Sequence, residues 1–252
     1  MFCLPGRLCI FVADMNNLPT LLIPEKIDIE SKQVLITWNN KGGQVKQLGK
    51  YWIKDEALTT QPIALYGNQT FVLVLAQLYS VALISPDDTL VSRLDRKWTK
   101  RDITTKTIAL ITEQDFPTFI KPVIPKIFIA GIFQNKTAFE QVTTGLQSTE
   151  EILVSSIVTP ILAEARSFVL NGEIKDIALY EGEASLDAGK VFLTDFLLAR
   201  KVDLPYSVVI DIAFNETLGW FILEFNACWG AGLNNCHAEK VIDCIISASI
   251  NL

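Results

Sequence analysis

Three oxygen-bearing side chains lie in one apolar stretch near the end of the chain, and their types and spacing could hold a cation. Residues 208–232 read VVIDIAFNETLGWFILEFNACWGAG. Two β-prone runs flank a short polar turn, which predicts a β-hairpin with Asp211 on one strand and Glu224 and Asn226 on the other. Glu224 and Asn226 are two residues apart and share a strand face. Their oxygens suit Mg²⁺, although an ordinary hairpin with an acid at its wet edge fits the same residues.

Two lysines earlier in the chain could bind phosphate groups. Residues 116–122, FPTFIKP, predict a short strand in which Lys121 faces the opposite way to Ile120. Lys126 follows, before the apolar run of residues 127–133. Lysines on adjoining strands can hold phosphates as point charges, or they can lie along the sheet with their charged ends in water.

Glu164 and Arg166 lie on a third predicted strand. Residues 163–170 alternate in polarity, so Glu164 and Arg166 share one face. Asn171-Gly172 predicts the two-residue turn of a type I′ hairpin, with residues 173–180 as the return strand. The two charges either neutralise each other at the surface, or Arg166 faces a cleft and binds a phosphate.

A cluster of cations precedes these strands. Such clusters are usually solvated, but one member, Arg101, could turn inward to an anionic ligand. We place the first domain boundary here, between residues 1–100 and residues 101–252. The six cations in the segment from Leu90 to Lys106 are Arg93, Arg96, Lys97, Lys100, Arg101 and Lys106.

The first hundred residues predict an α/β unit. The β-branched run at residues 34–38 predicts a strand that ends at Asn39–Gly43. A strand at residues 63–66, a buried helix at 71–79 and a strand at 81–84 then predict a parallel α/β unit. Ligands of such sheets bind at the carboxyl ends of the strands, here near Gly67 and Pro86.

Two helices complete the expected pattern in the second half of the chain. Residues 191–200 predict an amphipathic helix, and residues 238–249 predict a C-terminal helix that begins beside His237, the only histidine. A lone histidine at a helix start argues against serine or cysteine triad chemistry. The residues expected to face inward from the first helix are Phe192, Phe196, Leu197 and Ala199.

Composition excludes several classes of protein. The 252 residues are 50% hydrophobic, yet no apolar run approaches the ~18 residues of a membrane span. A net charge of −6 makes nucleic acid an unexpected partner. Five cysteines without a CxxC spacing indicate reduced thiols in a cytoplasmic protein. Met15 could be an alternative start, which would make residues 1–14 an upstream extension.

Taken in order, these segments resemble the ATP-grasp family, in which two α+β subdomains clamp ATP between antiparallel sheets. More closely, they resemble the bacterial and phage clade of that family named for two arginines and a lysine. The resemblance implies an α/β N-terminal domain followed by an α+β ATP-grasp domain. It rests on YGN at Tyr66, SPDD at Ser85, FIKP at Phe119, AEARSFVLNG at Ala163 and VVIDIAF…LEFNACWGAGL at Val208.

The resemblance also implies ATP and Mg²⁺ as cofactors and assigns roles to single residues. Arg166 would face the γ-phosphate or the acyl-phosphate formed from it and, with Lys121, would be catalytic. The hinge near adenine would be residues 150–156. The implied cofactor-binding residues are Lys121, Lys126, Glu151, Ser155, Glu164 and Arg101, and the implied metal ligands are Asp211, Glu224 and Asn226.

Activation of a carboxylate is the chemistry that this resemblance implies. ATP would phosphorylate the carboxylate, and an amine would attack the acyl-phosphate, so no protein nucleophile is required. The substrates would be small-molecule or peptide acids and amines, without nucleic acid or membrane. The sequence departs from the family where the glycine-rich flap is reduced to residues 124–131. The alternatives are a catalytically decayed Mg-ATP-binding module, a structural interaction protein or another phosphoryl transferase.

Overall fold

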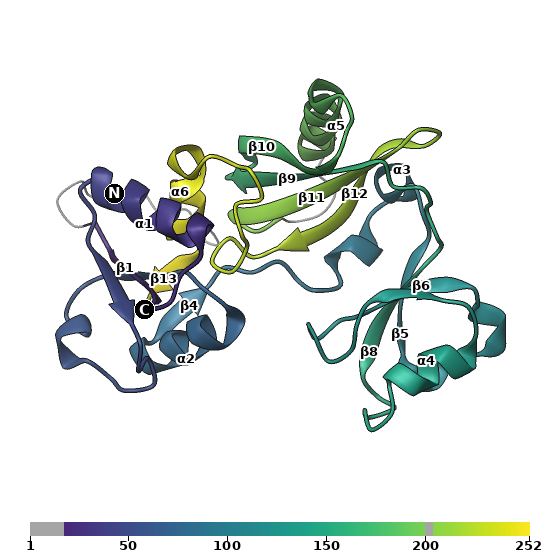
Figure 1. Cartoon of the computed structure of the whole chain (residues 1–252), viewed down its shortest axis with the longest axis horizontal. Coiled ribbons are helices and arrows are strands. Elements are labelled where there is room, and N and C mark those ends of the chain that lie inside the picture. The colour runs from purple at the N-terminus through teal and green to yellow at the C-terminus, as the bar shows by residue number, and fades with distance from the viewer. Residues whose placement is uncertain (1–17, 200–203) are drawn as a thin grey trace, which may run out of the picture.

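A computed structural model describes residues 18–199 and 204–252 of the chain. It contains an N-terminal α/β unit, a small antiparallel unit and a larger central antiparallel sheet that lies between them (Figure 1). Among the helices in these ranges, none combines the length and apolar character that a membrane-spanning segment needs. Met15, Cys3 and Cys9 lie outside the described residues.

The N-terminal unit is built on a parallel sheet with strand order β2-β1-β3. A second pair of strands, β13 and β4, is antiparallel and lies beside β3. The elements are β1 (Thr20–Pro24), α1 (Ile29–Asn40), β2 (Val45–Leu48), η1 (Glu56–Leu58), β3 (Ile63–Leu65), α2 (Gln69–Tyr79), β4 (Val81–Leu83) and β13 (Ser249–Asn251).

Helix α1 corrects the predicted strand at residues 34–38. Its buried residues are Val34, Thr37 and Trp38, which follow the spacing of one helix face, whereas Ile36 is 46% exposed. Asp28 starts the helix by accepting a hydrogen bond from the Ser31 amide at 2.7 Å. The predicted strand is wrong because a run of five largely apolar residues is too short to distinguish the two-residue repeat of a strand from the 3.6-residue repeat of a helix.

The predicted elements β3, α2 and β4 are confirmed, with Asn68 capping α2 through the Phe71 amide. The parallel α/β unit that they were predicted to form is interrupted, because β4 pairs with β13 in the antiparallel direction and not with β3. The Asn251 side chain of β13 accepts a hydrogen bond from the Ile63 amide of β3 at 2.9 Å. A strand that arrives from the other end of the sequence therefore lies between two strands that are neighbours in sequence.

The small antiparallel unit has strand order β5-β8-β6-β7. Its core packs around the fully buried Phe139 and Ile120. Lys126 lies in the loop of residues 123–130, so the expectation of a strand there is wrong; only the end of that apolar run is a strand. The elements are β5 (Ile103–Thr107), η3 (Ile108–Leu110), η4 (Glu113–Asp115), β6 (Thr118–Pro122), β7 (Gly131–Phe133), α4 (Lys136–Val142) and β8 (Glu151–Ser155).

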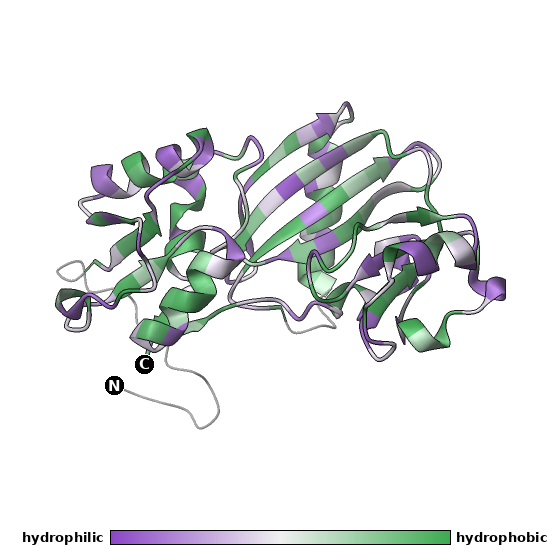
Figure 2. Cartoon of the chain, turned by 60° about the horizontal axis from the view of Figure 1, so that its bottom comes forward, coloured by the Kyte–Doolittle hydropathy of each residue, from purple (hydrophilic) through white to green (hydrophobic). Residues whose placement is uncertain are grey.

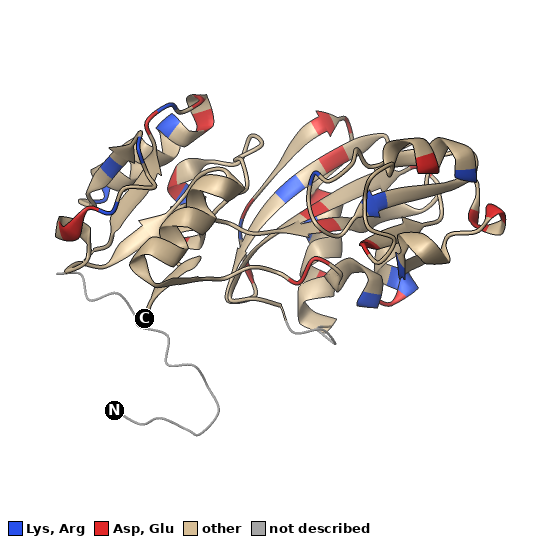
Figure 3. Cartoon of the chain, turned by 90° about the horizontal axis from the view of Figure 1, so that it is seen from below, with Lys and Arg blue, Asp and Glu red and all other residues tan. Residues whose placement is uncertain are grey.

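The central antiparallel sheet has strand order β10-β9-β11-β12. One face packs against α5 and α3, and acidic and basic positions lie side by side on its other face (Figure 3). Asn171 and Gly172 have φ values of 52° and 77°, as the predicted I′ turn requires. The elements are η2 (Leu90–Arg93), α3 (Arg96–Thr99), β9 (Ala163–Leu170), β10 (Glu173–Gly182), α5 (Leu186–Ala199), β11 (Ser207–Asn215) and β12 (Gly219–Asn226).

Both predicted helices of the second half exist with different bounds. Helix α5 begins at Leu186 and buries Leu193, whereas Ala199 is exposed rather than inward-facing. Helix α6 (Ala238–Ile246) ends three residues before Ser249, which belongs to β13. The helix stops there because residues 249–251 pair with β4. The local sequence pattern of residues 238–249 does not show this long-range pairing.

The end of the described chain packs on its beginning. Helix α6 and the loop before it share one apolar core with α1, α2 and the parallel sheet. Hydrophobic residues, which are green in Figure 2, lie along these elements. The core includes Leu21, Phe71, Leu233 and Ile242. The domain boundary at residue 100 stays a prediction, and the chain crosses back to the N-terminal unit after β12.

Gly182, at the end of β10, tests the packing of the central sheet. An alanine Cβ there would stand 1.9 Å from the Leu162 carbonyl oxygen, and the φ of +66° is already unfavourable for alanine. We expect Gly182→Ala to lower the free energy of unfolding by about 2 to 4 kcal/mol. Gly219, with φ of +73° and open space around it, is the control, for which about 1 kcal/mol is expected. Urea denaturation measures both, and equal losses would contradict the steric explanation.

Candidate functional site

A cavity of about 910 Å³ lies between the small antiparallel unit and the central sheet. Its volume is in the range of small-molecule sites. The loop of residues 123–130 forms one wall. Charged or polar residues that line the cavity are Asp87, Asp88, Arg101, Lys121, Lys126, Ser155, Glu164, Tyr180, Glu224 and Asn226.

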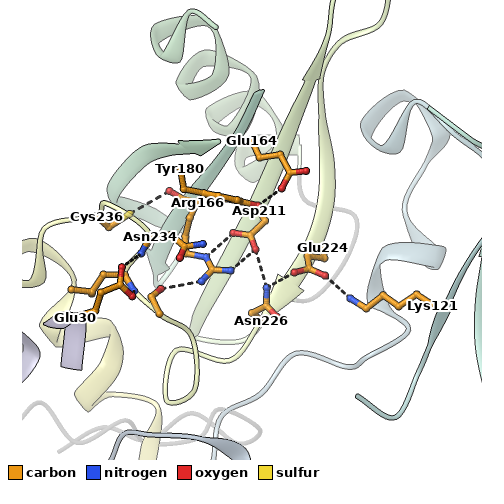
Figure 4. A network of polar contacts seen from close by, with 12 residues as sticks. Glu30, Lys121, Glu164, Arg166, Tyr180, Asp211, Glu224, Asn226, Asn234 and Cys236 are labelled. Atoms are coloured by element: carbon orange, nitrogen blue, oxygen red, sulfur yellow. Dashed lines mark hydrogen bonds and ion pairs between the residues drawn. The ribbon is translucent and has the colours of Figure 1, made fainter. Parts of the chain in front are cut away.

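Lys121 and Glu224 connect the two walls of the cavity. Lys121 projects from β6 on the side opposite to buried Ile120, as the alternation predicted. Its Nζ donates to Glu224 Oε2, on β12 of the central sheet (Figure 4). The only described cation that pairs with Glu224 therefore comes from the other unit.

A β-bulge sets the direction of Glu224. Asp211 opposes Glu224 and Ile212 opposes Ile222, which leaves Leu223 as an extra residue on β12. A bulge interrupts the alternation of a strand and re-aims the side chains beside it. Because of this bulge, Asp211 and Glu224 are directly opposite each other and lie on the same face of the sheet.

Asp211 and Arg166 form a buried ion pair behind the cavity. Arg166 Nε and Nη2 donate to the two carboxylate oxygens of Asp211 at 2.9 and 2.7 Å, and Arg166 Nη1 donates to the Gly232 carbonyl at 3.0 Å. Asp211 is 0% exposed. Burial raises the pKa of Asp211, and the Arg166 charge and hydrogen bonds oppose that rise. Burial lowers the pKa of Arg166, but the contacts with Asp211 outweigh it, so the net shift is upward.

Asn226 links the buried pair to the cavity. Its Nδ2 donates to Asp211 Oδ2 and to Glu224 Oε1, both at 3.0 Å. Burial raises the pKa of Glu224, yet the Lys121 charge and the hydrogen bonds from Asn226 and Lys121 lower it overall. Figure 4 shows one line of contacts from Lys121 through Glu224, Asn226 and Asp211 to Arg166.

Arg101 turns inward, whereas most of its cluster is solvated. Its guanidinium donates to the Ile222 and Leu223 carbonyls at the bulge, both at 2.9 Å, and lies over the Phe221 ring. Burial lowers the pKa of Arg101 to about 10, against the charge of Glu224. Within the described residues no carboxylate forms an ion pair with Arg101, so this half-buried guanidinium contributes an unpaired positive charge to the cavity wall.

Glu164 and Tyr180 close one side of the cavity. The Tyr180 hydroxyl donates to Glu164 Oε2 across the β9–β10 pair, and burial is the main cause that raises the pKa of Tyr180. Glu164 thus pairs with Tyr180, and Arg166 pairs with Asp211, so the two charged residues on this strand do not neutralise each other. Sequence reasoning missed Tyr180, because a bulge between Leu179 and Glu181 breaks the alternation of β10.

Seven of the ten residues predicted for the site line this cavity. Glu151 does not; it lies on a separate shallow depression that also contains Arg93. Arg166 and Asp211 lie one layer behind the cavity wall. Asp87 and Asp88 line both hollows, and their sequence signal was the position after β4, at the carboxyl end of a strand. The residues predicted and found on the cavity wall are Arg101, Lys121, Lys126, Ser155, Glu164, Glu224 and Asn226.

The chain matches a family model over residues 98–244, more than half its length: family 2 of the ATP-grasp domains in the clade named for two arginines and a lysine. This chain is an ATP-grasp protein of that clade. No curated protein matches the sequence of this ATP-grasp chain. The ATP-grasp fold, an α/β N-terminal unit followed by antiparallel sheets that face each other, is thereby confirmed.

Solved structures share the fold of this ATP-grasp protein at low sequence identity. A Bacillus anthracis D-alanine–D-alanine ligase superposes with a TM-score of 0.55 and 12% identity, covering 92% of this chain and 97% of that one. A D-cycloserine synthetase gives 0.58 and 12%, covering 90% and 98%. An Aspergillus clavatus N5-carboxyaminoimidazole synthase, in complex with ADP and 5-aminoimidazole ribonucleotide, gives a TM-score of 0.59 and 8% identity, covering 94% of this chain and 79% of that one.

The buried pair yields a prediction about stability. Arg166→Met leaves the Asp211 carboxylate buried without a counter-charge, so we expect a loss of about 3 to 5 kcal/mol in the free energy of unfolding. Lys175→Met, which removes the partly exposed pair with Glu173, is the control and should cost less than about 1 kcal/mol.

The pH dependence of that loss identifies its cause. Without Arg166, the pKa of folded Asp211 lies above its unfolded value, so the folded variant binds a proton that the unfolded chain releases. The stability deficit against wild type should therefore shrink as the pH falls from about 8 to about 5. Chemical denaturation at several pH values measures it, and a deficit that does not change with pH would exclude an uncompensated Asp211 charge.

Proposed function

We propose that this ATP-grasp protein is an ATP-dependent carboxylate–amine ligase that acts through an acyl-phosphate. The observation that carries the proposal is the cavity that is lined by the cations Lys121, Lys126 and Arg101 together with Glu224 and Asn226. Family membership suggests an ATP-dependent ligase, and one structure with this fold is a D-alanine–D-alanine ligase in complex with ATP. The finer reaction is the proposal.

A nucleotide triphosphate would place its phosphates toward the cations and its base toward the apolar wall. Apolar side chains at that wall include Ile103, Phe119 and Leu153. Ser155, at the end of β8, is within the cavity and is the proposed contact to the base or ribose. Lys121 and Lys126 would act as point charges on the phosphates. Glu151 faces another hollow, so its proposed contact with the base would need a rearrangement of β8.

The donor set fits Mg²⁺. Among the described residues, no group of three or more His, Cys, Asp or Glu is placed to hold a metal. Mg²⁺ bound to ATP needs only one or two carboxylates, with phosphates and water as further ligands. Glu224 and Asn226 offer oxygens at the cavity wall, and Asp211 supports them from behind as the third proposed ligand. When bound, the ion would neutralise charge that develops on the phosphates.

The protein groups would stabilise two successive transfers. A substrate carboxylate oxygen attacks the γ-phosphorus, ADP leaves, and an amine then attacks the acyl carbon and releases phosphate. Lys121 would move from Glu224 to the transferred phosphoryl group. Arg166 would stabilise the same charge, either directly after release from Asp211 or through Asp211 and Asn226. No protein nucleophile takes part.

A catalytically decayed Mg-ATP-binding module is the second candidate. The ion pairs of Glu224 with Lys121 and of Asp211 with Arg166 favour it, because both carboxylates are already neutralised. Calorimetry with Mg-ATP, together with a screen for ADP release over pairs of amino acids and peptides, separates the two. Tight binding without ADP from any pair would select the module.

Glu224 and Asn226 give the direct test of the proposed site. In the presence of the pair of substrates found by the screen, Glu224→Gln and Asn226→Ala should each reduce ADP formation by about a hundredfold or more. The first change removes the carboxylate charge at the proposed metal site, and the second removes the amide oxygen. Thermal unfolding checks that both variants are folded. Glu173→Gln, an exposed carboxylate of the same sheet, should keep wild-type turnover. Wild-type rates in either site variant would refute the metal assignment.

A further inference from the structure

The loop of residues 227–237 joins the central sheet to the N-terminal unit. Glu30 of α1 accepts hydrogen bonds from two consecutive amides of this loop, Leu233 and Asn234, both at 2.8 Å (Figure 4). Asn234 and Asn235 have positive φ values of 46° and 69°. Consecutive amides in such a turn form a concave site for an anion. Here the anion is a side chain more than two hundred residues away in sequence.

Helix α1 does not need Glu30 for its own N-terminus. Asp28 already caps that end through the Ser31 amide. The Glu30 carboxylate is therefore available to a second segment, and it binds the loop with both oxygens. Space is tight there, because a Cβ on Gly232 would stand 2.7 Å from Glu30 Oε2. A glycine permits this close approach.

One peptide group lies between Glu30 and Arg166. The peptide that joins Gly232 to Leu233 donates its N–H to Glu30 at 2.8 Å and accepts Arg166 Nη1 on its carbonyl at 3.0 Å. An anion and a cation thus polarise the same peptide from opposite ends, which strengthens both hydrogen bonds. The guanidinium has its remaining contacts to Asp211.

We propose that Glu30 is a positioning residue for the ATP site, acting through the Gly232–Leu233 peptide on Arg166. It orients the carbonyl that fixes the third contact of the guanidinium, and the N-terminal unit thereby influences the pair that supports Asn226 and Glu224. The part of the proposal that concerns nucleotide binding rests on the proposed function of Arg166. The hydrogen bonds that link Glu30 through this peptide to Arg166 do not depend on that proposed function.

Other contacts keep the loop attached when Glu30 is removed. The Tyr66 hydroxyl donates to the Ala231 carbonyl at 3.0 Å, and the Gly67 amide donates to the Trp229 carbonyl at 3.0 Å. A Glu30 variant should therefore fold, with a loop that is held but turned. Glu30→Gln, which keeps the shape and one acceptor oxygen, provides a milder variant than Glu30→Ala.

The first test follows the Arg166 Nε–H signal by NMR in the full chain, with Arg166→Lys used to assign it. In Glu30→Ala this proton should exchange with solvent at least about tenfold faster, with an intermediate effect in Glu30→Gln. Glu25→Gln is the matched control, since the structure shows no side-chain hydrogen bond or ion pair for Glu25 in the described part of the chain. An unchanged Arg166 signal, with faster exchange only at the Leu233 and Asn234 amides, would overturn the proposal.

The second test measures Mg·AMP-PNP binding by calorimetry. Glu30→Ala should weaken it by about tenfold, because displacement of a positioned group by a fraction of an ångström has effects of that order. The double variant with Arg166→Lys should bind within about twofold of Arg166→Lys alone, since both changes act on one contact. If the double variant instead lost affinity by the product of the two single losses, Glu30 would not act through Arg166. A wild-type protein that binds no Mg·AMP-PNP would refute the proposed function, and the Arg166 signal would then decide the positioning role.

Discussion

The ion pair between Asp211 and Arg166 is the constraint on which the site depends. A carboxylate with no exposure to solvent is costly unless a cation and hydrogen bonds compensate it. Asp211 and Arg166 are directly opposite on β11 and β9, so compensation requires this register between the two strands. The same register places Asn226 and Glu224 beside Asp211. A one-residue slip of β11 would turn Asp211 to the apolar face, away from Arg166, Asn226 and Glu224.

The sequence predicted which side chains of one strand lie on the same face, because side chains alternate between the two faces with a period of two. Lys121 opposite Ile120, the shared face of Glu164 and Arg166, and the turn at Asn171 all follow from this local rule. Which residue pairs with which could not be read, because strand register is a long-range property. Arg166 therefore has Asp211 as its partner, and Glu164 has Tyr180. The bulge at Leu223 is equally absent from the local pattern.

Tertiary packing also explains why some predictions of the fold were wrong. Val34, Thr37 and Trp38 are β-prone, but the parallel sheet offers a surface for a helix and buries them together. Glu151 was expected near the base because the resemblance implied a hinge at residues 150–156, yet Glu151 begins β8 and lies four residues from Ser155, at the other end of the strand. A hinge segment assigned by resemblance indicates which strand lies near a ligand. It does not show which residue of that strand contacts the ligand.

The crossing of the chain after β12 has a consequence during synthesis. Because β13 lies beside β3 and pairs with β4, and because α6 contributes to the core of the N-terminal unit, that unit is incomplete until the ribosome has released residues 238–251. A nascent chain would expose the apolar faces of β1, β3 and α2 until α6 is synthesised. Chaperone occupancy is therefore expected on residues 20–83 until residues 238–251 have emerged and packed against them.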